Sequence, residues 1–288
     1  MKDYTIYPVT NTYFGGSERK LGIIMGDEEY MIKFQKVESF GKRNNHLSEF
    51  LGSNIYELLG FDVQETSLGT YKNDNVVCCK NFVPKGYLFV PFNDVGESSL
   101  EQDANIYQYS YEDIMRMLQA NKKLTDLDEC ITIFWDMFIV DALLGNFDRH
   151  GSNWGFLKKD NKYKMCPIFD NGSSLYPSMI DENKMLMIMN DKVETDERIY
   201  RFPTSQIKLN NNKSSYYEVI SSLMFKECND SLIKIYNRIC LDKINKLIDN
   251  VENISDIHKE FYKYMIFNRY NKIIKFSYDK LMEKTNEK

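Results

Sequence analysis

The change in element type along the chain is the feature that most constrains its fold. Residues 4–92 consist mainly of short extended segments separated by turn residues, whereas from Tyr111 onward the apolar residues recur at helical spacing. Strands grouped before helices are typical of an α+β fold in which the two kinds of element form separate parts. A chain of 288 residues is long enough for this, since a single hydrophobic core stops growing at about 250–300 residues. We therefore predict two lobes.

Composition and charge exclude several classes of protein. Hydrophobic residues make up 43% of the chain and aromatic residues 14%, whereas chains that stay disordered are poor in both. The net charge is -5 and no long block of one sign occurs, which argues against a dedicated nucleic-acid-binding protein. The sequence therefore predicts a folded protein that does not bind nucleic acid directly.

The cysteines and the apolar segments indicate where the protein works. The six cysteines include no Cys-x-x-Cys pair, and the first residues lack the basic start and apolar run of a signal peptide, so we expect free thiols and a cytoplasmic location. Adjacent Cys78 and Cys79 are expected to be small buried apolar residues. The longest apolar stretch, residues 131–145, contains Asp136 and Asp141 and is too short and too charged to cross a membrane. We interpret it as a buried helix.

Particular segments carry the two patterns. Extended segments alternate with glycine or proline turns at residues 4–9, 20–25, 30–34, 67–71, 75–82 and 87–92. A helix is predicted at residues 45–60, with Gly60 as its stop. Helical spacing recurs at residues 111–119, 127–146, 229–251 and 257–284. Residues 171–215 are rich in Asn, Ser, Asp and Met without a clear period, so we predict a loop there, with an exposed turn at residues 210–215.

Three polar residues after the long apolar helix indicate chemistry. Asp148 and Asn153 stand five residues apart in the segment LLGNFDRHGSNWGFL, and Asp170 opens Asp-Asn-Gly. Protein kinases use an Asp that orients or deprotonates the acceptor hydroxyl, an Asn five residues later on Mg²⁺, and a second metal-binding Asp that opens Asp-Phe-Gly. Such residues supply the hard oxygen ligands and charge neutralisation that phosphoryl transfer needs. Each residue alone is typical of a turn, but their order and spacing together predict this reaction.

The companions that a kinase needs upstream are present. Lys33 lies between apolar neighbours in the extended segment YMIKF, where its ammonium group can reach the α- and β-phosphates of ATP. Its partner is expected to be a helix carboxylate, and the helix at residues 45–60 offers Glu49 and Glu57. Both lie off the apolar stripe, so periodicity does not choose between them.

Two loops complete the predicted nucleotide site. Gly15, Gly16 and Ser17 form a loop of small residues ahead of the lysine strand, and their backbone N–H groups can come close to phosphate oxygens. A Gly-Gly pair alone is more often an ordinary hairpin turn. Only its position in the chain makes it indicate a phosphate-binding loop. Asn81 and Phe82 come just before the expected connection between the lobes. We predict that the backbone of this connection hydrogen-bonds the adenine.

The motifs resemble those of the HipA-like serine/threonine kinases, including the compact CtkA-type members. The resemblance extends over most of the chain, from YFGGSERKLGIIM and YMIKF to DALLGNFDRHGSNWGFL and PIFDNGSSLYP. The family helix has a Glu followed eleven residues later by a Gly, which Glu49 and Gly60 match, so the resemblance favours Glu49 over Glu57. It implies a protein-kinase-like two-lobed fold, with a strand-rich N lobe at residues 1–92 and a mainly helical C lobe at residues 93–288.

The resemblance also implies a role for each motif residue. Asp148 would be the catalytic base, Asn153 and Asp170 the Mg²⁺ ligands, and Lys33 the lysine that holds the ATP phosphates. In HipA-like kinases a serine of the phosphate loop can be autophosphorylated, which ejects the loop and silences the enzyme, and Ser17 occupies the comparable place. A phosphate there would add about −1.5 to −2 charges where the ATP phosphates bind, so inhibition by repulsion is the expected effect.

Two departures from the family pattern leave questions to the structure. Many members have Asp-Asp-His where this chain has Asp148-Arg149-His150, and Arg149 either binds a phosphate or pairs with a carboxylate as structural support. His150 is expected to be a hydrogen-bonded scaffold residue rather than a second base. The chain also begins almost directly at the nucleotide-binding lobe, so we do not assume an antitoxin partner of the kind that HipA toxins bind.

Three functions are compatible with these residues. The first is an ATP- and Mg²⁺-dependent serine/threonine protein kinase that phosphorylates itself or another protein. The second is a small-molecule or lipid kinase on the same fold, because the sequence does not identify the acceptor. The third is a pseudokinase that only binds, against which the intact set of Lys33, Asp148, Asn153 and Asp170 argues. Residues 171–215 lie where kinases keep an activation segment and are expected to hold much of the substrate specificity.

Overall fold

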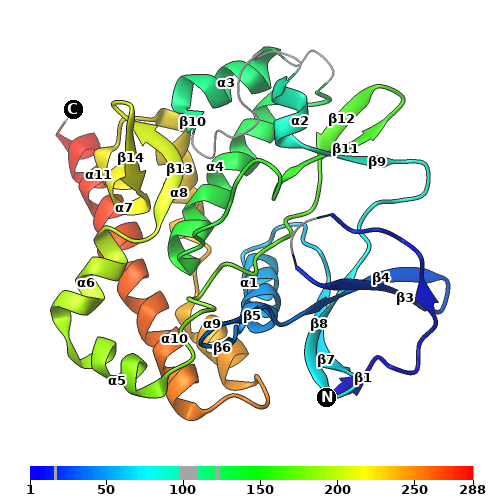
Figure 1. Ribbon diagram of the computed structural model, residues 1–288. Helices are drawn as coiled ribbons and strands as arrows, with labels where there is room; N and C mark the ends of the chain where they lie inside the picture. Colours follow the sequence, from blue (N-terminus) through cyan, green and yellow to red (C-terminus); the bar gives the residue numbers. More distant parts are fainter. Residues whose placement is uncertain (16–17, 98–108, 121–123, 288) are drawn as a thin grey trace.

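The chain divides into a strand-rich part and a mainly helical part (Figure 1). The computed structural model describes residues 1–15, 18–97, 109–120 and 124–287. The strand-rich part is built from the N-terminal end of the chain and the helical part from the remainder. This confirms the predicted α+β fold with a strand-rich N lobe and a mainly helical C lobe.

The sheet of the N lobe is mixed and six-stranded. Neighbouring strands pair antiparallel, except that β1 runs parallel to β7. A separate hairpin of β5 (Val37–Glu38) and β6 (Gly41–Lys42) follows β4. In spatial order the sheet comprises β1 (Lys2–Asp3), β7 (Thr66–Tyr71), β8 (Asp74–Lys80), β4 (Glu28–Phe34), β3 (Lys20–Met25) and β2 (Val9–Thr10).

The segment at residues 4–9 departs from its prediction. Only Val9 of this segment lies in a strand. The backbone N–H of Tyr7 instead closes a turn onto the carbonyl of Tyr4. The aromatic and β-branched residues that favour a strand here are overridden by this local turn.

One face of the N-lobe sheet forms a small apolar core. Ile32 lies opposite Cys78 and Phe34 lies opposite Val76 across strands β4 and β8, and all four side chains are buried. Because side chains alternate along a strand, Lys33 between them points to the other face, toward helix α1 (Asn45–Leu58). The strand period therefore sets the direction of the lysine.

Helix α1 lies between the sheet and the helical lobe (Figure 1). Leu47, Leu51 and Ile55 are buried along it, as the helical spacing predicts. The chain leaves the helix at Gly60, whose φ of +84° lies in the left-handed region that glycine adopts without strain. The predicted helix and its stop are both confirmed.

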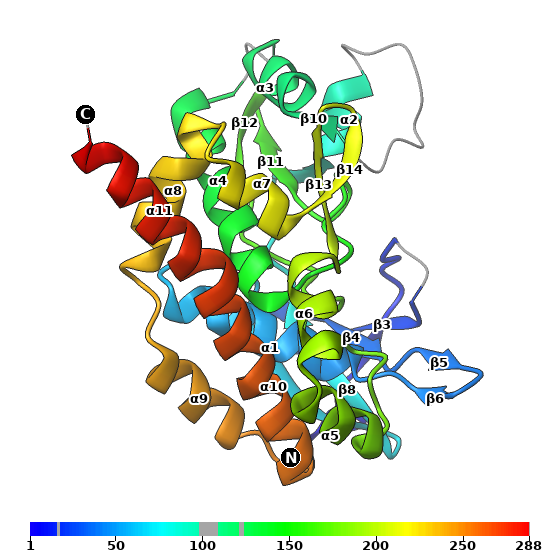
Figure 2. The same cartoon turned by 90° about the vertical axis from the view of Figure 1, so that its left-hand side faces the viewer.

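The C lobe is organised around the buried helix α4 (Leu127–Leu144). The Asp126 side chain caps its start by accepting a hydrogen bond from Glu129 N, and Gly145 ends it at a φ of +64°. Helices α3 (Tyr111–Ala120), α7 (Tyr216–Ser222) and α8 (Lys226–Tyr236) pack against it. Helix α2 (Phe92–Glu97) precedes them in the chain, and α9 (Leu241–Asp249) packs against α1. Helix α10 (Asp256–Arg269), a π-helical stretch η1 (Tyr270–Lys275) and α11 (Phe276–Asn286) form one long C-terminal rod (Figure 2).

Two small sheets belong to the C-terminal part of the fold. The first has the order β12-β11-β9, so strand β9 (Leu88–Pro91) pairs with β11 (Gly155–Lys159) and not with the N-lobe sheet. Strand β12 (Lys162–Met165) completes it. The second has the order β10-β13-β14, from β10 (Tyr109–Ser110), β13 (Thr204–Leu209) and β14 (Asn212–Ser215). The first sheet carries the loop that precedes β11, which contains the catalytic motif.

The prediction of a loop at residues 171–215 is wrong over most of that range. The range contains α5 (Glu182–Asn190) and α6 (Lys192–Tyr200), followed by the hairpin of β13 and β14. The two helices are nine residues each, too short to show a clear period in the sequence. The side chains of Asp181 and Asp191 cap their first turns by accepting backbone hydrogen bonds. The predicted exposed turn is present only at Asn210 and Asn211, which have positive φ angles.

The apolar segments and the cysteines behave as expected where the structure describes them. Among the described residues no helix combines the length and the apolar character that a membrane span requires. All six cysteines are free, five of them buried and Cys240 exposed. The stretch at residues 131–145 is mostly buried helix, as predicted.

We expect the fold to lose stability in mild acid because of His46 in α1. Burial lowers the pKa of His46 to about 4, whereas the unfolded value is about 6.5. Between these values the unfolded chain holds the proton and the folded chain does not, so stability falls as the pH drops from about 6.5 to about 4. Between these two pH values the free energy of unfolding should fall by about 3 kcal/mol.

Urea unfolding of the native protein and of a His46→Leu variant at about pH 7.5 and about pH 5 measures this effect. Between the two pH values, the free energy of unfolding of the variant should fall by about 2 kcal/mol less than that of the native protein. The comparison is a difference of differences, so a cavity or packing defect at residue 46 that acts equally at both pH values does not affect it. Equal acid losses in the two proteins would contradict the prediction.

Candidate active site

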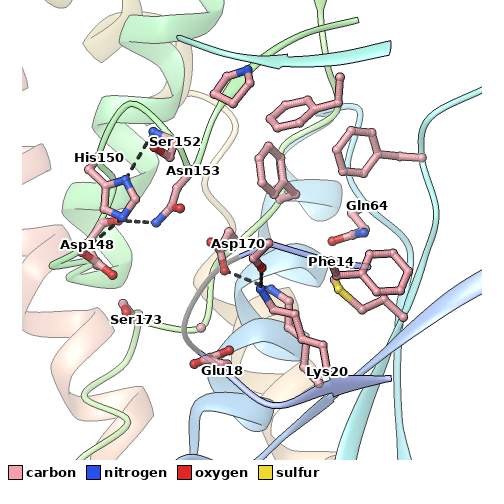
Figure 3. A pocket seen from close by; sticks show the side chains of 18 of the residues that line it. Phe14, Glu18, Lys20, Gln64, Asp148, His150, Ser152, Asn153, Asp170 and Ser173 are labelled. Carbon is pink, nitrogen blue, oxygen red and sulfur yellow. Dashed lines mark hydrogen bonds and ion pairs between the residues drawn. The ribbon is translucent and has the colours of Figure 1, made fainter. Parts of the chain in front are cut away.

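A cavity of about 840 Å³ lies between the two lobes (Figure 3). Its volume suits a nucleotide, since small-molecule sites usually measure about 300–1,000 Å³. Glu49 and Arg149 do not line this cavity, and Gly16 and Ser17 lie outside the described residues. The other predicted site residues all line the cavity, namely Gly15, Lys33, Asn81, Phe82, Asp148, His150, Asn153 and Asp170.

Lys33 joins three segments that are far apart in the sequence. Its Nζ lies 2.7 Å from Glu49 Oε2 and 2.9 Å from Asp170 Oδ1. Burial alone would lower the pKa of Lys33, but the charges of Asp170 and Glu49 raise it well above its ordinary value, so the side chain is an ammonium ion. Burial alone would raise the pKa of Asp170, but the charge of Lys33 and the hydrogen bond from it lower the pKa of this carboxyl. Glu57, the alternative partner, is exposed on α1.

The backbone around Asp170 is shaped for these contacts. Asp170 has a φ of +58°, which is uncommon for a residue other than glycine and costs about 1–3 kcal/mol. Asn171 donates its backbone N–H to Glu49 Oε1 at 3.0 Å. A Cβ at Gly172 would lie 3.3 Å from Glu49 Oε2, so glycine lets the segment pass close to α1. The carboxylate of Glu49 therefore holds both the lysine and the segment after Asp170.

The catalytic loop follows Gly145 and presents Asp148 to the cavity (Figure 3). Asn153 Nδ2 donates to Asp148 O at 2.6 Å, and His150 Nε2 lies 3.8 Å from Asp148 Oδ1. The Asp148 side chain is 52% exposed. Partial burial still raises the pKa of its carboxyl, and His150 opposes this while Asp170 adds to it. The loop thus holds a carboxylate that is accessible from the cavity and more basic than an ordinary Asp.

Arg149 is a structural residue in this fold. It is 4% exposed, and its Nε lies 2.8 Å from Asp141 Oδ2. It also donates to Asn153 O at 3.0 Å, to Phe169 O at 2.6 Å and to Asn171 Oδ1 at 2.6 Å. Of the two roles that the sequence left open, the structure shows pairing with a carboxylate. Arg149 ties the catalytic loop to the segment that carries Asp170.

His150 is part of the loop's hydrogen-bond structure. Its Nδ1 accepts a hydrogen bond from Ser152 N at 3.2 Å, and its other ring nitrogen faces Asp148. The ring is 25% exposed and lines the cavity. This arrangement fits the scaffold role that the sequence analysis expected.

The far end of the cavity is aromatic. Phe82, Phe89 and Phe169 form a cluster with ring centroids 5.1–5.8 Å apart. Asn81 donates its backbone N–H to Glu29 O, and its side-chain Oδ1 accepts a hydrogen bond from Val83 N. Asn81 therefore mainly shapes the turn. An apolar end with aromatic faces suits a flat heteroaromatic base. The sequence analysis missed Phe89 and Phe169, although Phe169 stands directly before Asp170.

The sequence analysis also missed two charged residues near the phosphate loop. Lys20 is the direct cross-strand partner of Lys33, and Glu18 lies beside it on the cavity wall. Burial raises the pKa of Glu18 and lowers that of Lys20, and Lys20 donates to Gly15 O. Gly15 is surrounded by open space. Only the strand register reveals Lys20, because two lysines thirteen positions apart show no motif.

The donor set fits a hydrated Mg²⁺ held together with phosphates. Asp170 offers a carboxylate, and the hydrogen bond from Asn153 Nδ2 to Asp148 O leaves Asn153 Oδ1 as the amide oxygen for a cation. Among the described residues no group of three or more His, Cys, Asp or Glu side chains could hold a metal ion alone. Mg²⁺ commonly takes one or two protein oxygens and fills its other positions with water and substrate phosphates, so two protein oxygens would be enough to hold it.

The chain is similar to known proteins over most of its length. The chain is 38% identical over 278 residues to "Serine/threonine-protein kinase CtkA" of Helicobacter pylori strain J99, covering 94% of this chain and 85% of that protein. It superposes on the crystal structure of the H. pylori proinflammatory kinase CtkA with a TM-score of 0.90 at 36% identity, over 98% of this chain and 97% of that one.

A more distant match and a family model complete the comparison. A Shewanella oneidensis HipA, solved with HipB and operator DNA, matches with a TM-score of 0.61 at 14% identity, over 93% of this chain and 67% of that one. It shows a shared fold. A sequence model of the HipA-like C-terminal domain matches residues 12–231. With this match over most of the chain and 38% identity to a curated relative, the chain belongs to the family of HipA-like C-terminal domains.

Proposed function

We propose that this chain is a serine/threonine protein kinase that uses ATP and Mg²⁺. The observation that carries the proposal is one cavity in which Lys33 is paired with Glu49 and Asp170 while Asp148 faces the same space. A relative that is 38% identical over most of the chain is named a serine/threonine-protein kinase. The intact set of charged residues supports an active enzyme rather than a binding module.

The residues of the site have separate roles in phosphoryl transfer. Lys33 is an ammonium ion and holds the ATP phosphates, with Glu49 fixing its position. The aromatic cluster of Phe82, Phe89 and Phe169 receives the adenine. Asp148 accepts a hydrogen bond from the acceptor hydroxyl and takes its proton as the new oxygen–phosphorus bond forms and the bond from the γ-phosphorus to ADP breaks, so that ADP leaves.

Asn153 and Asp170 would hold Mg²⁺ together with the phosphate oxygens. When bound, the metal neutralises phosphate charge and aligns the transferred group. Asp170 already forms an ion pair with Lys33, so the same carboxylate would serve both the lysine and the metal. Autophosphorylation at Ser17 remains a prediction from the family resemblance, and Ser17 lies outside the described residues.

The proposal is tested with the purified chain, γ-labelled ATP and Mg²⁺. We expect label on the chain itself or on generic protein acceptors, and phosphoamino acid analysis should find phosphoserine or phosphothreonine. Excess EDTA should abolish the transfer, because hard oxygen ligands alone do not replace the metal's charge. Transfer only to small hydroxyl compounds or lipids would assign the site to the alternative class of kinase, and no transfer to any acceptor would reject the proposal.

A further inference from the structure

A second, smaller cavity of about 180 Å³ adjoins the catalytic loop. One wall is the loop itself, with Phe147, Asp148 and His150, and these three residues also line the nucleotide cavity. The other wall is the hairpin of β13 and β14 with the start of α7 (Figure 2). The two cavities therefore share Asp148 as a lining residue.

The hairpin is fixed to the catalytic loop. Tyr216, the first residue of α7, donates its hydroxyl to Asn146 O at 3.0 Å. Asn146 in turn accepts a hydrogen bond from Asp148 N at 3.1 Å with its side chain. Ser215, the last residue of β14, caps α7 in a capping box. The wall opposite Asp148 thus keeps a constant position relative to the catalytic carboxylate.

Gln206 and Lys213 line this smaller cavity, and each has a donor group without a protein partner in the part of the chain that the structure describes. Gln206 is 8% exposed, and its Nε2 is buried with no hydrogen-bond partner in the part of the chain that the structure describes. An unpaired buried amide of this kind is unfavourable, and an acceptor atom of a bound molecule would satisfy it. Lys213 is exposed on β14, and no carboxylate among the described residues pairs with it.

The charge at the hairpin favours an anion. Lys208 lies directly opposite Lys213 in the β13–β14 register, and like charges in this position repel. The other acidic or basic side chains on the cavity wall are Asp148, His150 and Arg149, and Arg149 is already paired with Asp141. The cavity is therefore negative at the catalytic end and positive at the hairpin end.

The size of the cavity limits its occupant. At about 180 Å³ it is smaller than the roughly 300–1,000 Å³ of sites that enclose whole small molecules. It has room for a single side chain of a longer segment. A segment whose hydroxyl reaches Asp148 would place a neighbouring residue beside Lys213 and Gln206, as happens when a polypeptide is the acceptor.

We propose that this cavity is an acceptor subsite that selects a polypeptide with an anionic side chain next to the phosphorylated Ser or Thr. Lys213 pairs with the anionic group, and Gln206 Nε2 donates to one of its oxygens or to a backbone carbonyl of the acceptor. The anionic group is a carboxylate or a phosphate already present on the acceptor. The inference rests on the proposed kinase function and adds the substrate class.

The test uses the full chain with single-serine peptides that differ at one flanking position, carrying Glu, phosphoserine, Ala or Lys. The native chain should phosphorylate the best anionic peptide about five to ten times faster than its Lys counterpart. Lys213→Glu should reverse this preference. Its KM for ATP should not change, since Lys213 does not line the nucleotide cavity. Lys162→Glu is the matched control, an exposed lysine after the turn of another hairpin, and should keep the native preference.

The outcomes separate the subsite from the kinase function. A reversed preference in Lys213→Glu with the native pattern in Lys162→Glu supports the subsite, and the ranking of phosphoserine against Glu identifies the source of the anion. Peptide phosphorylation with the same preference in native and Lys213→Glu protein overturns the subsite and leaves the kinase function standing. No transfer to any peptide or to the chain itself overturns both. Thermal melting of Lys213→Glu checks that the exposed substitution leaves the fold intact.

Discussion

An Asp148→Asn variant should transfer phosphate about 10²–10⁴ times more slowly than the native chain. The amide keeps nearly the same shape but cannot take the proton of the acceptor hydroxyl. Binding of Mg·ATP should persist, because Lys33, Glu49 and Asp170 are untouched. Single-turnover transfer from labelled ATP measures the rate, and the shift in melting temperature with added Mg·ATP reports binding.

The same variant should be at least as stable as the native protein. Burial raises the pKa of Asp148 above its unfolded value, so the ionised form is less favourable in the folded chain. This penalty applies above the raised pKa and disappears as the pH falls through it. Asn carries no charge and removes the penalty. The backbone bonds of residue 148 to Asn146 and Asn153 stay in place.

Asp160→Asn is a matched control for this prediction. Asp160 lies in the exposed turn between β11 and β12 with a φ of +48°, a conformation that Asn tolerates. The control should retain native activity and stability. If Asp148→Asn transferred phosphate within about threefold of the native rate, Asp148 could not be the base.

The sequence predicted the residues that face the nucleotide cavity because kinase chemistry fixes their order and spacing. Asp148 and Asn153 belong to one short loop, and Lys33 sits on a strand whose alternation sets its direction. Such local patterns can be recognised from the sequence alone. The family resemblance selected Glu49 over Glu57, and the structure places Glu49 against Lys33, although periodicity alone left both open.

Residues whose role depends on packing between distant segments could not be predicted in this way. Lys20 meets Lys33 only through the β3–β4 register. Gln206 and Lys213 face Asp148 because a hairpin some sixty residues later folds back onto the catalytic loop. Helices α5 and α6 were missed for a different reason, since each is nine residues long and depends on an Asp cap. Short capped helices leave little periodic signal.

Arg149→Met should destabilise the fold by about 3–5 kcal/mol. The substitution leaves Asp141, which is 1% exposed, as a buried charge without its cation. Asp141 keeps hydrogen bonds from Tyr56 and Asn146, which offset only part of the loss. Urea unfolding gives the change in the free energy of unfolding. Arg201→Met, which removes an exposed arginine paired with Glu197 at 3.4 Å, should change it by less than about 1 kcal/mol.

The double variant Asp141→Asn/Arg149→Met separates the two roles of Arg149. Removing the buried carboxylate charge should restore about half of the lost stability, because the variant no longer carries an unpaired ion. Phosphate transfer should stay low, since the bonds from Arg149 to Asn153 O and Phe169 O are still missing and the catalytic loop is no longer tied to the Asp170 segment. Full recovery of activity with stability would show that Arg149 acts only through Asp141. Asp148→Asn has the opposite signature, with activity lost and stability kept, so the pair of variants distinguishes the group that reacts from the group that holds it in place.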